Sequence, residues 1–182
     1  GSGPITGPTG ALSPITSYEQ QLVAPVQASQ ETPEHQVWFW LLHDDSAPEE
    51  DCLEKLLTAV TNARSVGIVG PKQVGWDNPE LLLEVGLRAT ASARRANDIV
   101  PGEVDQGQHD DRSDVLAVGT AGALIDRAVW EEIGGIAPWL GPFGDGLELS
   151  RAARLAGYRV IVEPTAVVRH RRASYQGLRR PA

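Results

Sequence analysis

Residues 37–46 read Val37-Trp38-Phe39-Trp40-Leu41-Leu42-His43-Asp44-Asp45-Ser46. Six apolar residues followed by a histidine and two carboxylates indicate a buried strand that reaches the surface at its carboxyl end. Open α/β sheets bind ligands at that end, and hard divalent cations prefer oxygen ligands. Asp44 and Asp45 are therefore candidates for holding a cation against phosphate oxygens. The alternative is that one of them only caps the helix that follows.

The composition is that of an ordinary globular domain, with 182 residues, 41% of them hydrophobic and 22% charged. No stretch approaches the roughly 20 apolar residues that span a bilayer, and no secretory signal opens the chain. The one cysteine, Cys52, fits a reducing compartment and lies in a helical pattern, so we expect a buried, inert thiol. The chain has no methionine and Gly1-Ser2-Gly3 resembles a cloning remnant, so we expect a piece of a longer protein.

The net charge of −8 is unevenly distributed. Residues 1–150 carry 23 acidic and 8 basic side chains, whereas residues 151–182 carry eight arginines and one glutamate. No nucleic-acid motif accompanies these arginines, so we expect residues 173–182 to be a basic tail that meets a phosphate-bearing ligand or a membrane surface. A merely solvated tail is the alternative. The expected location is cytoplasmic, with the inner face of a membrane as a further option.

Strands alternate with helices along the chain, which favours an α/β sandwich with a mainly parallel central sheet. Ser46 is the expected N-cap of the second helix, and glycines end the last two. We predict strands at 37–42, 66–69, 81–88, 92–96, 115–125 and 158–163, the last followed by an extended segment at 165–169. We predict helices at 17–30, 46–63, 127–133 and 145–157, and a flexible lead-in at 1–16.

Residues 97–113 form a long polar segment without the periodicity of a helix or a strand. Loops of this length within a compact domain are often functional. We predict that it lies over the same sheet edge as Asp45 and helps to form an acceptor site, the alternative being a mobile surface excursion.

Four motifs in order resemble those of the family 2 glycosyltransferases, which have the GT-A fold. Each motif is weak alone, but together they extend over roughly 130 residues, and we interpret residues 17–172 as a partial domain of that kind. The motifs are Trp38 to Ser46, Val118 to Ile125 with Trp130 to Ile136, Phe143 to Leu149 with Arg154 to Tyr158, and Pro164 to His170.

The resemblance implies transfer of a sugar from a nucleotide-diphosphate donor to a glycan or lipid-linked acceptor, such as a cell envelope polysaccharide, with Mg²⁺ or Mn²⁺. In such enzymes the metal neutralises charge that builds on the leaving diphosphate. The implied metal ligands are Asp45 and His170. The implied substrate-binding residues are His43, Asp44, Gly122 and Glu148.

The sequence departs from the family at two places. Gly146 stands where the family's usual general base is found, so either Asp145 is the catalytic base or activity is impaired. The alternative role for Asp145 is to cap the helix that follows. Nothing before Val37 resembles the strands that hold the nucleotide, so we expect the N-terminal part of the domain to be missing. A non-catalytic relative with a binding or scaffolding role is the alternative function.

Overall fold

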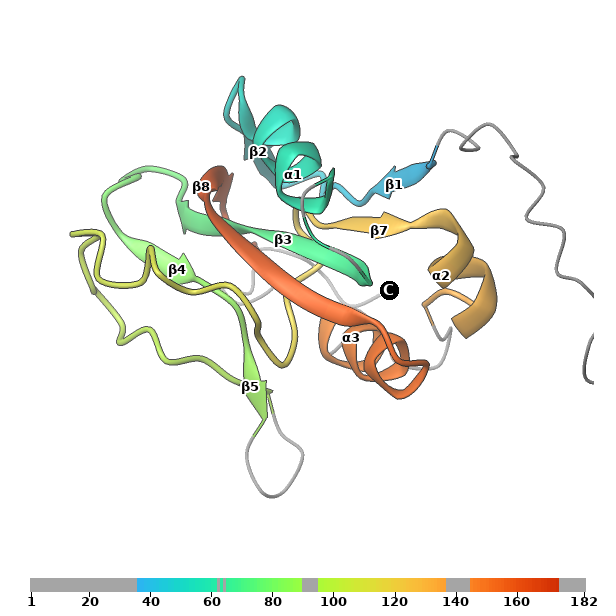
Figure 1. The fold of residues 1–182 in the computed structure, drawn as a ribbon. Coiled ribbons are helices and arrows are strands. Elements are labelled where there is room, and N and C mark those ends of the chain that lie inside the picture. Colours follow the sequence, from blue (N-terminus) through green and yellow to red (C-terminus); the bar gives the residue numbers. More distant parts are fainter. Residues whose placement is uncertain (1–35, 62, 64, 90–94, 137–144, 174–182) are drawn as a thin grey trace, which may run out of the picture. The chain divides into compact units, whose positions relative to one another are not determined.

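Two long neighbouring strands form the centre of the sheet. The computed structural model describes residues 36–61, 63, 65–89, 95–136 and 145–173. Strand β3 (Val66–Gly75) is almost wholly buried and runs parallel to β8 (Arg159–His170) (Figure 1). Their register places Gly75 opposite His170, so the carboxyl ends of both strands meet at the same end of the sheet.

Short strands flank this pair in the order β1-β7-β3-β8-β2, with β4 beside β3. Their pairings are all antiparallel. The bounds are β1 Trp38–Trp40, β2 Ser46–Pro48, β4 Leu82–Glu84 and β7 Leu124–Asp126, while β5 (Arg88–Ala89) and β6 (Arg95–Ala96) form a separate two-stranded sheet.

The α/β class is confirmed, but the prediction of a mainly parallel sheet holds only for the central pair. Within the described residues, β3 and β8 form the one parallel pairing. A parallel neighbour needs a long crossover connection, whereas an antiparallel neighbour can follow a short turn. The connection from β3 to β4 is too short for a crossover, so β4 returns antiparallel.

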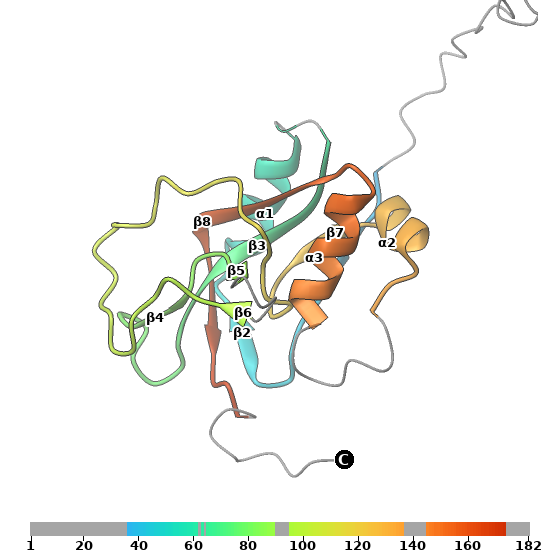
Figure 2. The ribbon, with the colours of Figure 1, turned by 90° about the horizontal axis from the view of Figure 1, so that it is seen from below.

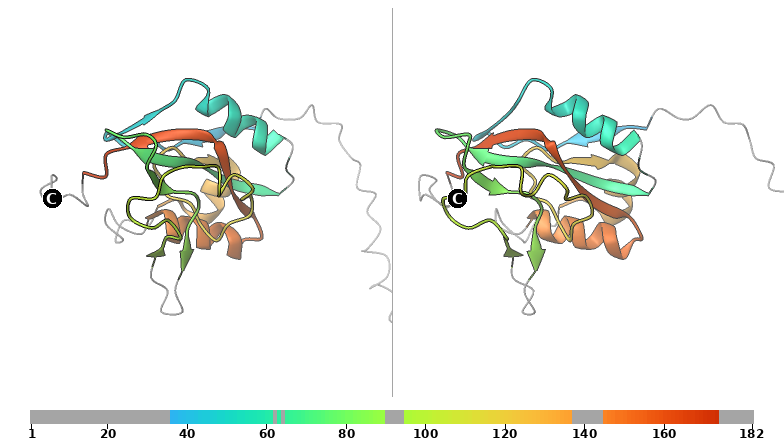
Figure 3. Two further views of the ribbon diagram at one scale, coloured as in Figure 1. Left: turned by 90° about the vertical axis from the view of Figure 1, so that its left-hand side faces the viewer. Right: turned by 60° about the vertical axis from the view of Figure 1, so that its left-hand side comes forward.

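Helices cover both faces of the sheet (Figures 1 and 3). Helix α1 (Cys52–Thr61) packs Leu56 and Val60 against Val69 and Val168 on one face. On the other face, helices α2 (Arg127–Ile133) and α3 (Asp145–Leu155) lie near each other (Figure 2) and share a second core with the sheet. That core includes Ile68, Val129, Leu149, Ala153, Val160 and Val162.

The second helix starts later than predicted, because the predicted cap belongs to a strand. Ser46 pairs with His170 in the sheet, and its hydroxyl closes a turn with the backbone of His43. Helix α1 begins at Cys52 and ends at Thr61. Cys52 itself is buried, as predicted.

Two strands continue through prolines that were expected to end them. Strand β3 passes through Gly70 and Pro71, and β8 passes through Pro164. The register between the two strands shifts at these positions, and the Glu163 carboxylate accepts hydrogen bonds from the backbone and hydroxyl of Thr165. Proline is tolerated in a strand where such an irregularity removes the need for its missing N–H.

The predicted strands at 37–42, 81–88 and 115–125 are shorter than expected, whereas the predicted strand at 92–96 lies partly outside the described residues, of which 95 and 96 form β6. The chain turns at Gly122, where φ is 90°, so β7 comprises only Leu124–Asp126. Between residues 114 and 117 there are only isolated bridges. Gly86, with φ of 74°, separates β4 from β5, and β1 is a half-buried edge strand in the described part of the chain rather than a fully buried one.

The last two helices were predicted closely. Helix α2 starts after Asp126, whose carboxylate accepts hydrogen bonds from Ala128 and Val129, and it ends at Gly134 in the left-handed conformation. Helix α3 is followed by Gly157, with φ of 94°. The predicted lead-in, the helix at 17–30 and nearly all of the basic tail lie outside the described residues. Across the described ranges, the helices are too short or too polar to span a membrane.

Candidate functional site

The segment between β1 and β2 places Asp45 beside the end of β8. The Ser46 hydroxyl donates to the carbonyl of His43 at 2.9 Å and accepts from its N–H at 3.1 Å, which fixes the turn. The backbone N–H of Arg171 donates to the carbonyl of Asp45 at 2.9 Å. Since Ser46 also pairs with His170, these backbone contacts hold Asp45 next to the His170 ring.

His43, Asp45 and His170 form a compact cluster with one ligand atom from each residue within 4.8 Å of the others. Asp45 Oδ1 lies 3.3 Å from His170 Nε2 and 4.0 Å from His43 Nδ1. The two imidazole rings meet edge to face with their centroids 5.3 Å apart. Two imidazole nitrogens and a carboxylate oxygen are a suitable ligand set for a divalent cation.

The hydrogen bonds of His43 leave its Nδ1 as an acceptor. Thr120 donates its hydroxyl hydrogen to Asp145 Oδ2 at 2.8 Å. The same hydroxyl oxygen lies 2.9 Å from His43 Nε2, so the ring N–H must be on Nε2 and must donate to Thr120. In a neutral ring the lone pair is then on Nδ1, the atom that faces Asp45.

The hydrogen bonds of His170 leave its Nε2 as an acceptor. His170 Nδ1 lies 3.0 Å from the amide oxygen of Gln73, which can only accept, so the ring N–H is on Nδ1. Burial lowers the pKa of His170, although Asp45 opposes this shift. In a neutral ring the lone pair is then on Nε2 and faces Asp45, as metal ligation requires.

The Asp45 carboxylate is ionised at neutral pH. Burial favours its protonated form, but the backbone N–H of Ala173, at 2.9 Å from Oδ2, and the nearby His170 and His43 outweigh burial and lower its pKa. An ionised carboxylate between two imidazole lone pairs is a strongly attractive environment for a cation.

Asp145 belongs to the same hydrogen-bond network. Its Oδ1 accepts the N–H of Gly146 at 2.8 Å, and its Oδ2 is linked through Thr120 to His43. Asp145 is the first residue of α3, so it also lies at the positive end of the helix dipole. Thr120 thus links the predicted base, Asp145, to His43, and through His43 to the cluster that contains the predicted metal ligands Asp45 and His170.

The predicted substrate-binding residues other than His43 lie in different settings. Asp44 is exposed in the same turn as Asp45. Glu148 is one turn along α3 from Asp145 and pairs with Arg151 at 2.6 Å. Gly122 is buried, and its N–H and carbonyl are hydrogen-bonded to the backbone of Leu41 and the indole of Trp40. Their substrate-binding roles stay predictions.

Sequence reasoning missed the polar residues that hold the cluster. Thr120, Gln73 and Glu84 are nearly completely buried and contact the cluster directly or through one another. A signal was present for Glu84, because it is the one charged residue in the apolar run Leu81 to Val85. A charge in such a run requires buried partners.

Ion pairs and a backbone hydrogen bond hold the loop at 97–113 against β3 and β4. Lys72 of β3 is buried and donates to Asp105 at 2.7 Å and Asp110 at 2.6 Å. The backbone of Leu82 donates to the carbonyl of Glu103. The predicted absence of helix and strand from this segment is confirmed, and its role in an acceptor site stays a prediction.

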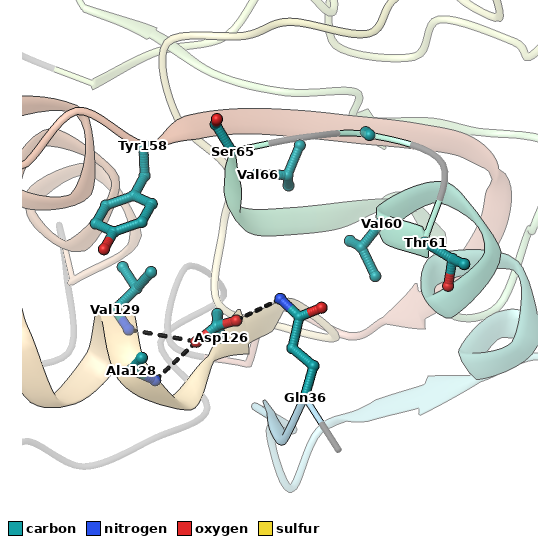
Figure 4. Close-up of a pocket in the computed structure, with 10 residues that line it drawn as sticks. Gln36, Val60, Thr61, Ser65, Val66, Asp126, Ala128, Val129 and Tyr158 are labelled. Atoms are coloured by element: carbon teal, nitrogen blue, oxygen red, sulfur yellow. Dashed lines mark hydrogen bonds between the residues drawn. The ribbon is translucent and has the colours of Figure 1, made fainter. Parts of the chain in front are cut away.

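A separate cavity of ≈ 590 Å³ lies at the opposite end of β3, beside Val66 (Figure 4). Among the described residues of its lining, Asp126 is the charged one. Its carboxylate caps α2 and accepts a hydrogen bond from Gln36 (Figure 4). These bonds give Asp126 a structural role, so the cluster at the other end of β3 is the stronger candidate site.

Comparisons with known proteins identify the family and the fold of the chain. The family model "Glycosyltransferase like family 2" matches residues 13–180. The crystal structure of GalNAc-T7 with UDP, GalNAc and Mn²⁺ is similar to this chain, with a TM-score of 0.55, 16% sequence identity and coverage of 73% of this chain and 27% of that chain. This chain thus spans about a quarter of that structure, and the similarity shows the GT-A-like fold. No match was found among curated proteins.

Proposed function

The chain belongs to the glycosyltransferase-like family 2, and from this premise we propose that it transfers a sugar, with inversion, from a nucleotide-diphosphate donor to an acceptor hydroxyl. The observation that carries the proposal is the cluster of His43, Asp45 and His170 and its link through Thr120 to Asp145.

We assign the cluster to one divalent cation, with His43 added to the ligands Asp45 and His170 that the sequence suggests. Mg²⁺ prefers oxygen ligands, whereas two of the three groups here are imidazole nitrogens. Mn²⁺ therefore fits the site better than Mg²⁺, and the Mn²⁺ of the structurally similar GalNAc-T7 supports this choice. When bound, the cation would neutralise negative charge on the leaving diphosphate.

The base in this proposal is Asp145. Its carboxylate would accept the proton of the acceptor hydroxyl as the acceptor oxygen bonds to the anomeric carbon and the bond from that carbon to the diphosphate breaks. Thr120 and the N–H of Gly146 orient the carboxylate. Asp44 and Glu148 are proposed to contact the donor.

Isothermal titration calorimetry with Mn²⁺ and Mg²⁺ tests the metal assignment. We expect Mn²⁺ to bind more tightly than Mg²⁺, and Asp45→Asn to abolish Mn²⁺ binding without loss of the fold. Asp44→Asn is the matched control, since it removes an exposed carboxylate from the same turn and should leave Mn²⁺ affinity within about twofold. Equal Mn²⁺ affinity in the wild type and Asp45→Asn would contradict the assignment.

Transfer assays on the full-length polypeptide test the base. With a panel of nucleotide sugars, Asp145→Asn should lower turnover by about 10² to 10⁴ and leave donor affinity unchanged, because a base acts in the transition state. A variant with full turnover would exclude Asp145 as the base.

A second candidate function is a non-catalytic relative that binds a nucleotide sugar. The observation that favours it is Gly146, which occupies the family's base position without a carboxylate. This candidate predicts donor binding with Mn²⁺ but no transfer by the full-length polypeptide, which the same assays would reveal.

The acceptor in our proposal is a glycan or lipid-linked sugar at the inner face of a membrane. The arginines of the C-terminal segment support an anionic acceptor or surface. Co-sedimentation with vesicles containing an anionic lipid, compared with neutral vesicles, tests the surface, and equal binding to both would contradict it.

A further inference from the structure

Glu84 is a carboxylate buried in the centre of the domain, with 1% of its surface exposed. Such a charge is very costly unless hydrogen bonds and opposite charges compensate it. Within the described part of the chain its polar neighbours include groups from Gly119, Gln73 and Arg172, and each of these three leads to a different residue of the candidate metal site.

The first group is the backbone of Gly119. Its N–H donates to Glu84 Oε1 at 2.6 Å. A Cβ atom at this position would lie 2.8 Å from Gln73 Nε2 and from Glu84 Oε1, so any larger residue would displace these two side chains. The next residue is Thr120, which contacts His43 and Asp145. Glu84 thus fixes the backbone that presents the Thr120 hydroxyl.

The second group is the amide of Gln73, which has 2% of its surface exposed. Its NH₂ faces Glu84 Oε1 at 3.5 Å, and its oxygen faces His170 Nδ1 at 3.0 Å. The opposite amide orientation would put the Gln73 oxygen against the Glu84 carboxylate, which is repulsive. Glu84 therefore determines that Gln73 accepts from His170, and Gln73 determines that the His170 lone pair is on Nε2.

The third group is the guanidinium of Arg172, 3.9 Å from Glu84 Oε2 and hydrogen-bonded to the carbonyl of Leu83 at 2.8 Å. Arg172 has a φ of 53°, a left-handed conformation that costs energy for a residue other than glycine. That conformation precedes Ala173, whose N–H donates to Asp45 Oδ2. The anchored side chain stabilises the turn that holds Asp45.

We propose that Glu84 and Gln73 are positioning residues of the metal site: they hold His170 in the tautomer with its Nε2 lone pair toward Asp45, and Glu84 also secures the backbone around Thr120 and Ala173. This inference rests on the proposed function, since it assigns a supporting shell to that cation site. Residues in such a shell change metal affinity by about 10- to 100-fold when they are substituted.

Two near-isosteric variants and one control test the inference. Gln73→Met removes the acceptor for His170 and keeps the side-chain volume. Glu84→Gln keeps the acceptor for Gly119 but removes the charge that faces Arg172. Ser150→Ala is the control, because Ser150 is also buried and hydrogen-bonded to the neighbouring Val118 but has no bond to the cluster in the described contacts. Thermal unfolding verifies that each variant folds.

The first readout is the tautomer of His170 in the metal-free protein, from long-range ¹H–¹⁵N NMR spectra. We expect protonated Nδ1 in the wild type and in Ser150→Ala, and a mixture of tautomers in Gln73→Met. The second readout is Mn²⁺ affinity by calorimetry, which we expect to fall about 10- to 100-fold in Gln73→Met and Glu84→Gln but not in Ser150→Ala.

An unchanged His170 tautomer in Gln73→Met, or unchanged Mn²⁺ affinity in both folded variants, would overturn the inference. A wild-type protein that does not bind Mn²⁺ would instead overturn the proposed function. The metal-free NMR spectra would still decide the tautomer, so the two failures are distinguishable.

Discussion

At the scale of single residues, the backbone that packs against Gly146 leaves no space for a side chain at this position. A Cβ atom there would be 2.3 Å from the carbonyl oxygen of Val118 and 3.0 Å from the Cα of Gly119. Helix α3 therefore approaches the backbone before Thr120 more closely than any side chain would permit. The absence of a carboxylate at position 146 and the close approach of α3 to this backbone therefore go together, because the approach requires a residue without a side chain.

We predict that Gly146→Asp does not create a base but destabilises the protein by about 1–3 kcal/mol, the usual effect of overpacking. Gly146→Ala should cause most of the same loss, because the contact is made by Cβ. Urea denaturation of both variants measures this. Wild-type stability in Gly146→Ala, or sugar transfer gained by Gly146→Asp, would contradict the prediction.

At the scale of elements, Lys72 connects β3 with the loop at 97–113. Burial tends to lower the pKa of Lys72, but its hydrogen bonds to Asp105 and Asp110 outweigh burial and raise it. For Asp105, burial is likewise outweighed, mainly by the bond from Lys72, and the pKa is lowered. A lowered carboxyl pKa stabilises the fold above the ordinary value near 3.8, and this contribution is lost as pH falls through the lowered pKa.

We predict that Lys72→Met destabilises the protein by about 1–2 kcal/mol, less than for a fully buried pair because both carboxylates are partly exposed. Hydrogen exchange should accelerate in residues 103–112. Lys55→Met, which breaks an exposed pair between Lys55 of α1 and Asp51 just before this helix, is the control and should cost no more than about 0.5 kcal/mol. If exchange in this loop is the same in Lys72→Met and the wild type, the pairing does not hold the loop.

Among the elements, helix ends could be predicted from the sequence better than strand extents. Asp126 and Gly134 bound α2 through contacts within a few residues, so a local pattern is sufficient. Strand extents depend on partners far along the chain: β3 passes through Pro71 because β8 has a register shift there. Ser46 had the pattern of a helix cap, but pairing with His170 decided its conformation.

The candidate site was predictable only in part for the same reason. The motif at His43 to Asp45 indicated a cation from its local chemistry. His170 was assigned from the resemblance to the family. Thr120 and Gln73 contact the cluster across 77 and 97 residues of sequence, and no local pattern encodes such separations.

At the scale of the whole molecule, the accessibility of the buried Cys52 thiol depends on whether the domain is folded. It has 0% exposure, and burial, together with Asp51, raises the pKa of its thiol to about 11. A pKa raised from 9.0 means that the folded state holds its proton more tightly than the unfolded state. The resulting stabilisation is present below pH 9 and is lost as pH rises toward 11.

We predict that the thiol reacts with a disulfide reagent at pH 8 about 10³-fold or more slowly in the folded protein than in urea, as expected for a stability of about 5 kcal/mol or more. From pH 9 to 11 the wild type should lose more stability than Cys52→Ala. A thiol that reacts equally fast in the folded protein and in urea would show that Cys52 is accessible. Parallel profiles of stability against pH for the wild type and Cys52→Ala would show that folding does not raise the pKa of this thiol.

The cluster combines residues from distant parts of the chain, with Asp45 near the start of the described region and His170 in its last strand. During synthesis on the ribosome, Asp45 emerges long before β8 exists. A cation that needs both residues can therefore be captured only after the last strand has entered the sheet beside β3. Loading of the proposed cation would then mark the completion of folding, and a chain truncated before His170 would leave the ribosome without the proposed site.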